Sequence, residues 1–230
     1  MKISILTLFP EMFAGPFSES IVKRAIEKQQ VDIELVQIRN FGIGTHKMVD
    51  DRPFGGGVGM VMRVDVIDNA INSVKNANLS KDEEQVILLD ARGKTFKQNH
   101  AISFSKLKHL ILLCGHYEGV DERVRNLVDQ TISLGDFIVT GGEIPAMLIT
   151  DAVVRLIPGV LKEHATGLES FSLVSETKQL LEYPQYTMPR EYKGMTVPDI
   201  LVSGNHPEIN KWKQQEAEKI TKQHRPDLLS

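Results

Sequence analysis

The chain has 230 residues, of which 41% are hydrophobic and 25% are charged, and its formal net charge is −3. This length and apolar content indicate a soluble globular protein with one large core, or one core and a smaller one. The near-neutral charge excludes a globally basic nucleic-acid binder, so any polyanion partner must meet a local basic surface.

The N-terminus and the single cysteine indicate the compartment. The first ten residues, "MKISILTLFP", hold one lysine and an apolar stretch that is too short for a signal peptide or a membrane span. Cys114 lies in the apolar run "LILLCG", which excludes an intrachain disulfide framework and favours a buried thiol in a reducing compartment. We therefore expect a cytoplasmic protein with no membrane partner.

Strands and helices alternate along the first two thirds of the chain. Short apolar runs bounded by turns predict buried strands at 2–9, 31–38, 85–90 and 109–115. Helical periodicity predicts helices at 18–30, where Ser18 or Ser20 would be the cap, and at 64–77 and 97–108. A short amphipathic segment at 119–130 and a strand-like run at 130–139 follow. This order predicts an α/β fold with a mainly parallel sheet.

A long apolar helix closes this first domain. It is predicted at least from Pro145, a residue suited to a first turn, until Pro158 and Gly159 stop it. We expect a domain at 1–160, an interdomain linker at 161–178, where no period is sustained, and a small domain at 179–230. The small domain should contain one long helix from about Pro207, with Trp212 facing inward and lysines around it. An ordinary solvated face is the favoured explanation of those lysines, because glutamates lie among them.

Glycine-bearing turns follow three of the expected strands: "DARG" (90–93), "CGHYEGVDER" (114–123) and "LGDFIVTGGEIPA" (134–146). Ligands of open α/β sheets bind beyond the carboxyl ends of the strands, so these loops predict one small-molecule site; tight turns are the alternative explanation for the glycines. No complete dinucleotide fingerprint, phosphate-binding-loop lysine or zinc spacing is present, so hydride transfer, nucleotide hydrolysis and a dedicated metal site are poorly supported.

Six segments in order resemble the bacterial tRNA (guanine-N1)-methyltransferases, and the resemblance runs almost from end to end. They are "VDDRPFGGGVGM" (49–60), "CGHYEGVDER" (114–123), "GDFIVTGGEIPAM" (135–147), "RLIPGVL" (155–161), "YPQYTMP" (183–189) and "VPDILVSGNH" (197–206). The resemblance implies a knotted, SPOUT-type methyltransferase: an α/β domain with a mainly parallel sheet and a C-terminal trefoil knot, plus a small, mostly helical C-terminal domain. Periodicity alone would predict a plain doubly wound sheet, because true knots are nearly absent from proteins.

The resemblance also implies that S-adenosyl-L-methionine binds against the glycine-rich loops. The cofactor-binding positions that it implies are Leu88, Gly115, Tyr117, Glu118, Leu134, Gly135, Asp136, Phe137, Ile138, Val139, Gly141 and Gly142. The family's Pro-Gln-Gly turn is replaced by "DARG", which puts the adenosine contacts at Asp90 and Ala91 in question. The family often depends on Mg²⁺, but the sequence shows no cluster of ligands for this ion.

The implied reaction is methyl transfer to N1 of the guanosine immediately 3′ of the anticodon (tRNA position 37). A base must remove the N1 proton while negative charge builds on O6. Arg155 matches the family's catalytic arginine, with a surface ion pair as its alternative role. Glu169 of "ESF" stands where the family usually has the aspartate of Asp-Ser-Phe, and an exposed loop charge is the alternative. About five extra residues follow, so Glu176 is a second candidate for the base.

The resemblance implies a homodimer whose active sites are shared, with tRNA bound by the "DDRPFGGG" loop and the C-terminal helix. The apolar residues of "IPAMLITDAVV" would form the interface. The chain ends slightly earlier than the family, which predicts a shorter last helix. Two other functions stay open: an RNA ribose 2′-O-methyltransferase of the same class, and a non-catalytic RNA-binding relative.

Overall fold

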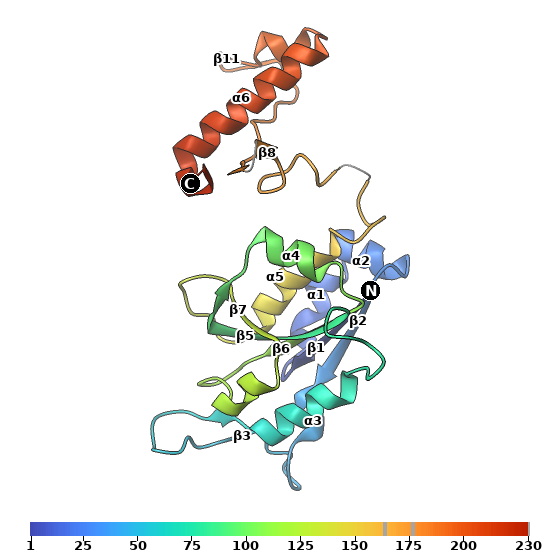
Figure 1. Cartoon of the computed structure of the whole chain (residues 1–230), viewed down its shortest axis with the longest axis vertical. Coiled ribbons are helices and arrows are strands. Elements are labelled where there is room, and N and C mark those ends of the chain that lie inside the picture. Colours follow the sequence, from blue (N-terminus) through green and yellow to red (C-terminus); the bar gives the residue numbers. More distant parts are fainter. Residues whose placement is uncertain (163–164, 176–177, 230) are drawn as a thin grey trace. The chain divides into compact units, whose positions relative to one another are not determined.

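The computed structural model describes residues 1–162, 165–175 and 178–229, and within them five parallel strands form one sheet (Figure 1). The strand order is β2-β1-β6-β5-β7. The bounds are Lys2–Thr7 for β1, Asp32–Gln37 for β2, Glu84–Thr95 for β5, His109–Cys114 for β6 and Gln130–Ser133 for β7. Every neighbouring pair is parallel, which confirms the predicted α/β fold with a mainly parallel sheet.

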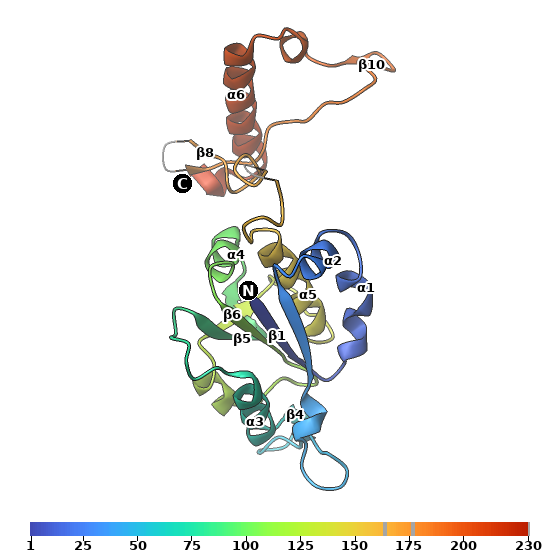
Figure 2. The ribbon, with the colours of Figure 1, turned by 90° about the vertical axis from the view of Figure 1, so that its right-hand side faces the viewer.

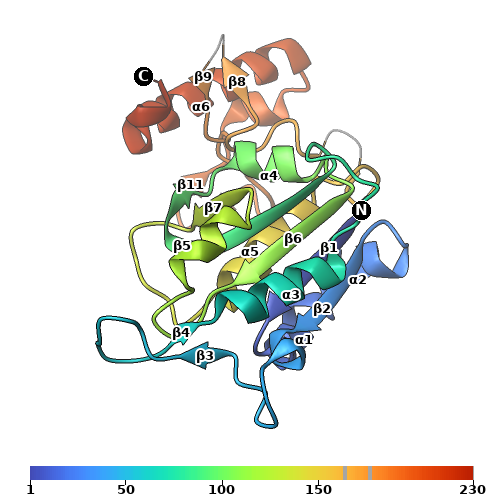
Figure 3. The same cartoon turned by 60° about the horizontal axis from the view of Figure 1, so that its bottom comes forward.

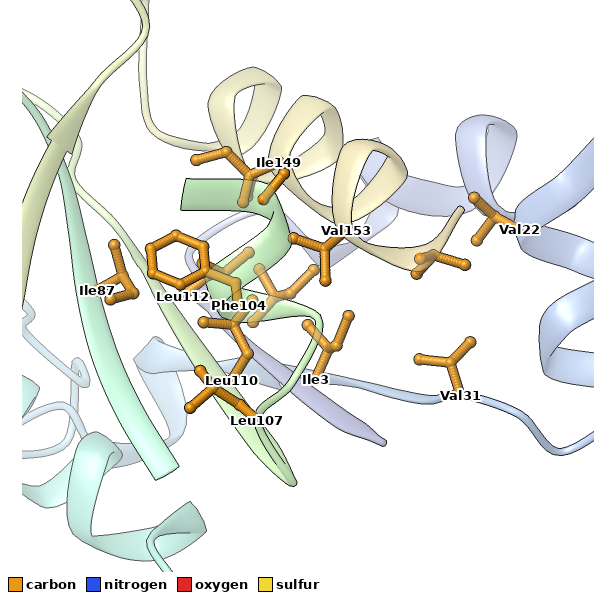
Figure 4. Packing of buried hydrophobic residues seen from close by; sticks show 14 of the residues in the cluster. Ile3, Val22, Val31, Ile87, Phe104, Leu107, Leu110, Leu112, Ile149 and Val153 are labelled. Carbon is orange, nitrogen blue, oxygen red and sulfur yellow. The ribbon is translucent and has the colours of Figure 1, made fainter. Parts of the chain in front are cut away.

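Alternate residues of these strands face two apolar layers. On one face, Ile3 and Leu110 lie under three helices, α2 (Ser20–Glu27), α4 (Gln98–Phe104) and α5 (Glu143–Val154) (Figure 4). On the other face, Leu88 and Leu113 lie under α3 (Val64–Val74) and the 3₁₀ helix η3 (Glu122–Asn126). Because both faces are covered, the strands carry continuous apolar runs, as buried parallel strands do. Shorter helices complete this unit: η1 (Pro10–Phe13), α1 (Ala14–Phe17) and η2 (Ile38–Phe41).

Several predicted boundaries are wrong. Neither Ser18 nor Ser20 caps α2: Glu19 is the N-cap residue, and Ser20 begins the helix with a φ of +55°. The helix α5 begins at Glu143, which agrees with a helix at least from Pro145, but it ends at Val154, before the predicted stop at Pro158. The strand-like run at 130–139 is a strand only to Ser133, because β5 ends its pairing with β7 there and Gly135 turns the chain with a φ of +150°.

Two short antiparallel strands carry the glycine-rich arm of the first unit, residues 52–60. The strands are β3 (Asp50–Asp51) and β4 (Val61–Met62), and the arm between them projects to the left in Figure 3. Gly55, Gly56, Gly57 and Gly59 have φ angles between +81° and +132°, a range that residues with a Cβ rarely adopt. Phe54 and Val58 are almost wholly exposed on this arm.

The chain divides into two compact units, Met1–Leu161 and a second that begins at Lys162. The second unit is built around the long helix α6 (His206–His224), which Figure 2 shows from the side. Its core is Leu180, Tyr183 and Ala217, and Trp212 is half-buried beside Tyr186. The smaller elements are β8 (Val174–Ser175), β9 (Lys178–Gln179), β10 (Glu191–Tyr192), β11 (Met195–Thr196), η4 (Asp199–Val202) and η5 (Pro226–Leu229).

The segment expected to be a linker, 161–178, contains a strand. Val174 and Ser175 of β8 pair antiparallel with Gln179 and Lys178 of β9, and this small sheet belongs to the second unit. None of the helices in the described ranges has the length and apolarity that crossing a lipid bilayer requires.

Candidate active site

A cavity of about 1480 Å³ opens where β6 and β7 end and α5 begins, beside the middle of β5. Its walls come from the ends of these strands, from the turn before α5, and from the strands and arm around β3 and β4. Parallel strands bring their carboxyl ends to one edge of the sheet, and this is where open α/β sheets bind ligands. The three glycine-bearing segments that begin at Asp90, Cys114 and Leu134 therefore converge on one cavity, although the first of them lies within β5 and is not a turn.

Ten of the twelve positions predicted to bind cofactor line this cavity. They are Leu88, Gly115, Tyr117, Glu118, Leu134, Phe137, Ile138, Val139, Gly141 and Gly142. The cavity lining does not include Gly135 or Asp136, whereas it does include Asp90 and Ala91, which replace the family's usual turn. Phe137 and Ile138 are 57% and 83% exposed, so an apolar part of the wall faces outward from this chain.

Gly142 packs so closely against the end of β6 that no side chain fits at its position. A Cβ on Gly142 would lie 2.5 Å from the Cα of Cys114, and the N–H of Gly142 donates a hydrogen bond of 2.8 Å to the carbonyl of Gly115. At Gly115 the situation differs, because a Cβ there would meet only the carbonyl of Leu89 at 3.4 Å and a methyl of Val120. Gly142 is therefore a packing glycine, while Gly115 keeps the cavity open.

Gly141 lies against a buried polar cluster, Thr7–Glu143–His116. A Cβ on Gly141 would collide with Oε2 of Glu143 and lie 2.6 Å from Nδ1 of His116. Glu143 is 1% exposed and accepts a hydrogen bond of 2.8 Å from the Thr7 hydroxyl. Burial and then the charge of Glu143 raise the pKa of the neighbouring Cys114 thiol well above its usual range. Cys114 is buried and free, as predicted.

Ion pairs made by Asp90 and Asp121 lie on another part of the cavity wall. Asp90 accepts hydrogen bonds from the backbone of Arg92 at 2.7 Å and from the side chain of Arg125 at 2.8 Å. Burial alone would raise the pKa of the Asp90 carboxyl, but these bonds and the charges of the two arginines lower it. The side chain of Arg123 bonds to Asp121 and lowers the pKa of that carboxyl to about 2. Both carboxylates are thereby held in the charged form on the cavity wall.

Arg155 is the C-cap residue of α5, at the opposite end of the helix from Gly142. The two residues are thirteen positions apart, which corresponds to about 20 Å along a helix. Arg155 is half-buried and does not line the cavity. The structure therefore does not bring Arg155 to the cofactor positions of its own chain.

Glu169 belongs to the second unit. Its backbone carbonyl accepts hydrogen bonds from the N–H groups of Ser172 and Leu173, so the "ESF" triplet forms a turn. The Ser170 hydroxyl accepts from the backbone of Glu182, and Phe171 has a φ of +69° and donates to the carbonyl of Leu180. Glu169 is half-buried in this turn. Glu176, the second candidate for the base, lies outside the described residues.

Comparison with known proteins identifies the family. A profile of the family described as tRNA (Guanine-1)-methyltransferase TrmD matches residues 1–230. The chain belongs to this family. A tRNA (guanine-N(1)-)-methyltransferase of Desulforudis audaxviator is 55% identical over 229 residues, covering 100% of this chain and 90% of the relative. Proteins of the same name from Dictyoglomus turgidum and Staphylococcus epidermidis are 52% and 47% identical over 231 and 230 residues, covering 90% and 91% of their lengths.

Sequence reasoning missed the Thr7–Glu143–His116 cluster of this family member. Its one local signal is Thr7, a polar residue at the carboxyl end of β1. His116 and Glu143 lie in two of the glycine-bearing segments, but nothing in the neighbouring sequence predicts that the Glu143 carboxylate is buried against both β1 and His116. In the described part of the chain, no group of three or more histidine, cysteine or acidic side chains is placed to hold a metal ion.

Proposed function

We propose that this protein transfers the methyl group of S-adenosylmethionine to N1 of the guanosine immediately 3′ of a tRNA anticodon, with the cofactor in the cavity at the carboxyl ends of β6 and β7, beside the middle of β5. Membership of the family makes the chain a tRNA (guanine-N1)-methyltransferase that uses S-adenosylmethionine as methyl donor. The cofactor site, the position in tRNA and the roles of single residues are our inferences. The observation that carries them is the convergence of the glycine-bearing turns on one cavity.

The cavity residues fit the cofactor. When bound, S-adenosylmethionine supplies a methyl group that is activated by a sulfonium charge. Gly115 and Gly141 offer bare backbone, and adenine edges pair well with main-chain donors and acceptors. Leu88, Leu134 and Ile138 offer apolar surface for a ring. We propose that the turns from Gly115 to Gly142 belong to the trefoil knot that the family resemblance implies.

Two charged residues carry the chemistry in this proposal. Glu169 accepts the N1 proton of guanine as the new carbon–nitrogen bond forms, which leaves the base neutral after transfer. The guanidinium of Arg155 donates hydrogen bonds to O6, where negative charge builds during the reaction. A carboxylate and a fixed cation are what this reaction requires of the protein.

A homodimer reconciles the position of Arg155 with this chemistry. Arg155 is about 20 Å along α5 from Gly142, so one chain does not supply both to one site. Ile144 and Leu148 are 49% and 48% exposed and lie on the face of α5 that leads to Arg155. If two copies pack these faces antiparallel about a two-fold axis, Arg155 of each copy approaches the cavity of the other.

The second unit and the glycine-rich arm are proposed to bind tRNA in the cytoplasm. Residues 179–230 would form the tRNA-binding domain and 161–178 the connection to the cofactor domain, 1–160. Lys211 and Lys222 are exposed on α6, whereas Lys219 pairs with Glu216 and Lys213 lies over the ring of Tyr183. Binding through phosphate contacts should weaken as salt increases.

The assay that tests this function is incubation of the protein with labelled S-adenosylmethionine and unmodified tRNA, with and without Mg²⁺, followed by digestion to nucleosides. We expect 1-methylguanosine, mapped to the position 3′ of the anticodon. A ribose-methylated nucleoside would instead show the 2′-O-methyltransferase activity, and no labelled nucleoside under either condition would indicate an RNA-binding relative without catalysis.

The assignment of the base is tested by Glu169→Gln. The amide keeps the size and hydrogen bonding of the side chain but does not accept the proton, so single-turnover methyl transfer should slow by about 10² to 10⁴. Glu169→Asp should retain much of the rate, and cofactor affinity should be unchanged in both variants. Glu176→Gln is measured beside them: a large loss only in Glu176→Gln would move the base to that residue, and no loss in either would contradict a carboxylate base in this segment.

A further inference from the structure

Glu143 places a buried negative charge directly beneath the cofactor cavity. Its side chain is 1% exposed and lies in the first turn of α5. Two features offset part of the cost of burying this charge: the Thr7 hydroxyl donates to Oε1 at 2.8 Å, and the start of a helix favours a carboxylate. Gly141, which lines the cavity, lies against the other oxygen, Oε2.

The compensation at Oε2 is incomplete. Nδ1 of His116 is 3.8 Å from it, which is too long for a hydrogen bond. That nitrogen is buried and has no hydrogen-bond partner among the described residues. The ring of His116 is held by its neighbours instead, with centroids 4.8 Å from Phe9 and 5.0 Å from Tyr117. A buried carboxylate beside a buried histidine nitrogen that makes no hydrogen bond costs stability and calls for an explanation.

The cavity lies on the other side of the Gly141 turn, and the ligand proposed to bind there provides the explanation. S-adenosylmethionine is positively charged at sulfur; when its methyl carbon bonds to N1, sulfur keeps the electron pair of the broken bond and the remaining molecule, S-adenosylhomocysteine, has lost that charge. We propose that Glu143 is a specificity-determining residue whose buried charge, next to the cavity-lining Gly141, makes the cavity bind the cationic methyl donor more tightly than the neutral product. The inference rests on the proposed binding of the cofactor in this cavity.

This role needs no direct contact. Electrostatic attraction acts through the glycine turn, because the effective dielectric constant inside a protein is about 20 rather than 80. At this dielectric constant, attraction between two nearby unit charges changes a binding constant by about tenfold. Weaker binding of the product would also speed its release after each transfer. The absence of a Cβ at Gly141 keeps the carboxylate close to the cavity wall.

The test is calorimetric titration of the full-length chain with S-adenosylmethionine and with S-adenosylhomocysteine. In Glu143→Gln, affinity for the methyl donor should fall about tenfold while affinity for the product changes less than about twofold. The fold should be as stable as the wild type or more stable, because the amide oxygen still accepts from Thr7 and the variant no longer buries a charge. Glu143→Asp keeps the charge and should retain the preference for the donor.

Glu84→Gln is the matched control. Glu84 is also a buried glutamate with a histidine partner, but it lies at the amino end of the sheet, so the ratio of the two affinities should stay unchanged. Equal weakening of both ligands in Glu143→Gln, loss of stability with it, or loss of all binding would mean that the carboxylate is structural and would overturn the proposal. If the wild type binds neither ligand, the proposed cofactor site itself fails.

Discussion

Two histidine–glutamate pairs, each with a buried glutamate, lie at opposite ends of the central sheet, and they differ in how fully their hydrogen bonds are made. At the amino ends of β5 and β6, His109 bonds through Nδ1 to Glu84 at 2.7 Å and through Nε2 to the Ser4 hydroxyl at 2.9 Å. The backbone N–H of Asn76 donates a second hydrogen bond to Glu84. At the carboxyl ends, His116 stops 3.8 Å short of Glu143.

Under the proposed function, this difference separates an end of the sheet that serves stability from an end that serves binding. A buried polar network in which every group is satisfied stabilises one arrangement of the strands. A network whose hydrogen bonds are incomplete beside a cavity leaves a charged side chain able to attract a ligand, and it lowers the stability of the folded protein. The same residue types therefore serve different purposes at the two ends, and substitutions at the two ends should separate stability from binding.

The largest loss of stability is expected at the amino end, in His109→Ala. The truncation leaves Glu84 and Ser4 buried without their shared partner, so the free energy of unfolding should fall by about 3–5 kcal/mol. Denaturant unfolding followed by circular dichroism measures this, with the exposed His46→Ala as a control that should change by less than about 0.5 kcal/mol. A loss below about 1 kcal/mol would show that the satisfied pair is not what holds these strands.

A smaller loss is expected at the carboxyl end, in Gly141→Ala. The added Cβ would collide with Glu143 and crowd His116, so stability should fall by about 1–3 kcal/mol and S-adenosylmethionine should bind more weakly. Gly15→Ala is the control, because a Cβ there meets no atom within 4 Å. In a double-mutant cycle with Glu143→Ala, the stability cost should shrink. An unchanged cost would mean that the glycine is needed for another reason.

The strands and their convergence on one site were predictable from sequence for a simple reason. Both faces of the sheet are covered, so each strand is a short apolar run, and parallel strands necessarily end at a common edge. The extension of β5 through "DARG" to Thr95 was not predictable, because Asp90 and Arg92 favour a turn. It depends on Gly93, where a Cβ would lie 2.6 Å from the backbone of Ile132 in the neighbouring strand.

The Thr7–Glu143–His116 cluster was beyond sequence reasoning for a different reason. Thr7 and Glu143 are 136 residues apart, and only the packing of α5 on β1 joins them. The two glycines before α5 were interpreted as close approach to a ligand. In the structure, Gly142 makes room for β6 and Gly141 makes room for the buried carboxylate, so internal packing also requires the bare backbone.

The central claim is that one complete active site needs two copies of this chain, and isolated mixed dimers test it most directly. Gly115→Val should fill the cavity, since a Cβ at this position lies 3.4 Å from its nearest neighbour, and Arg155→Ala should remove the cation; each variant alone should be inactive. Differently tagged copies allow the mixed dimer to be purified and assayed for 1-methylguanosine formation. In a two-fold dimer with shared sites, one of its two sites keeps both an open cavity and an Arg155, so the mixed dimer should show about half of the wild-type activity. Mixed dimers as inactive as either parent variant would contradict the account and place the whole site within one chain.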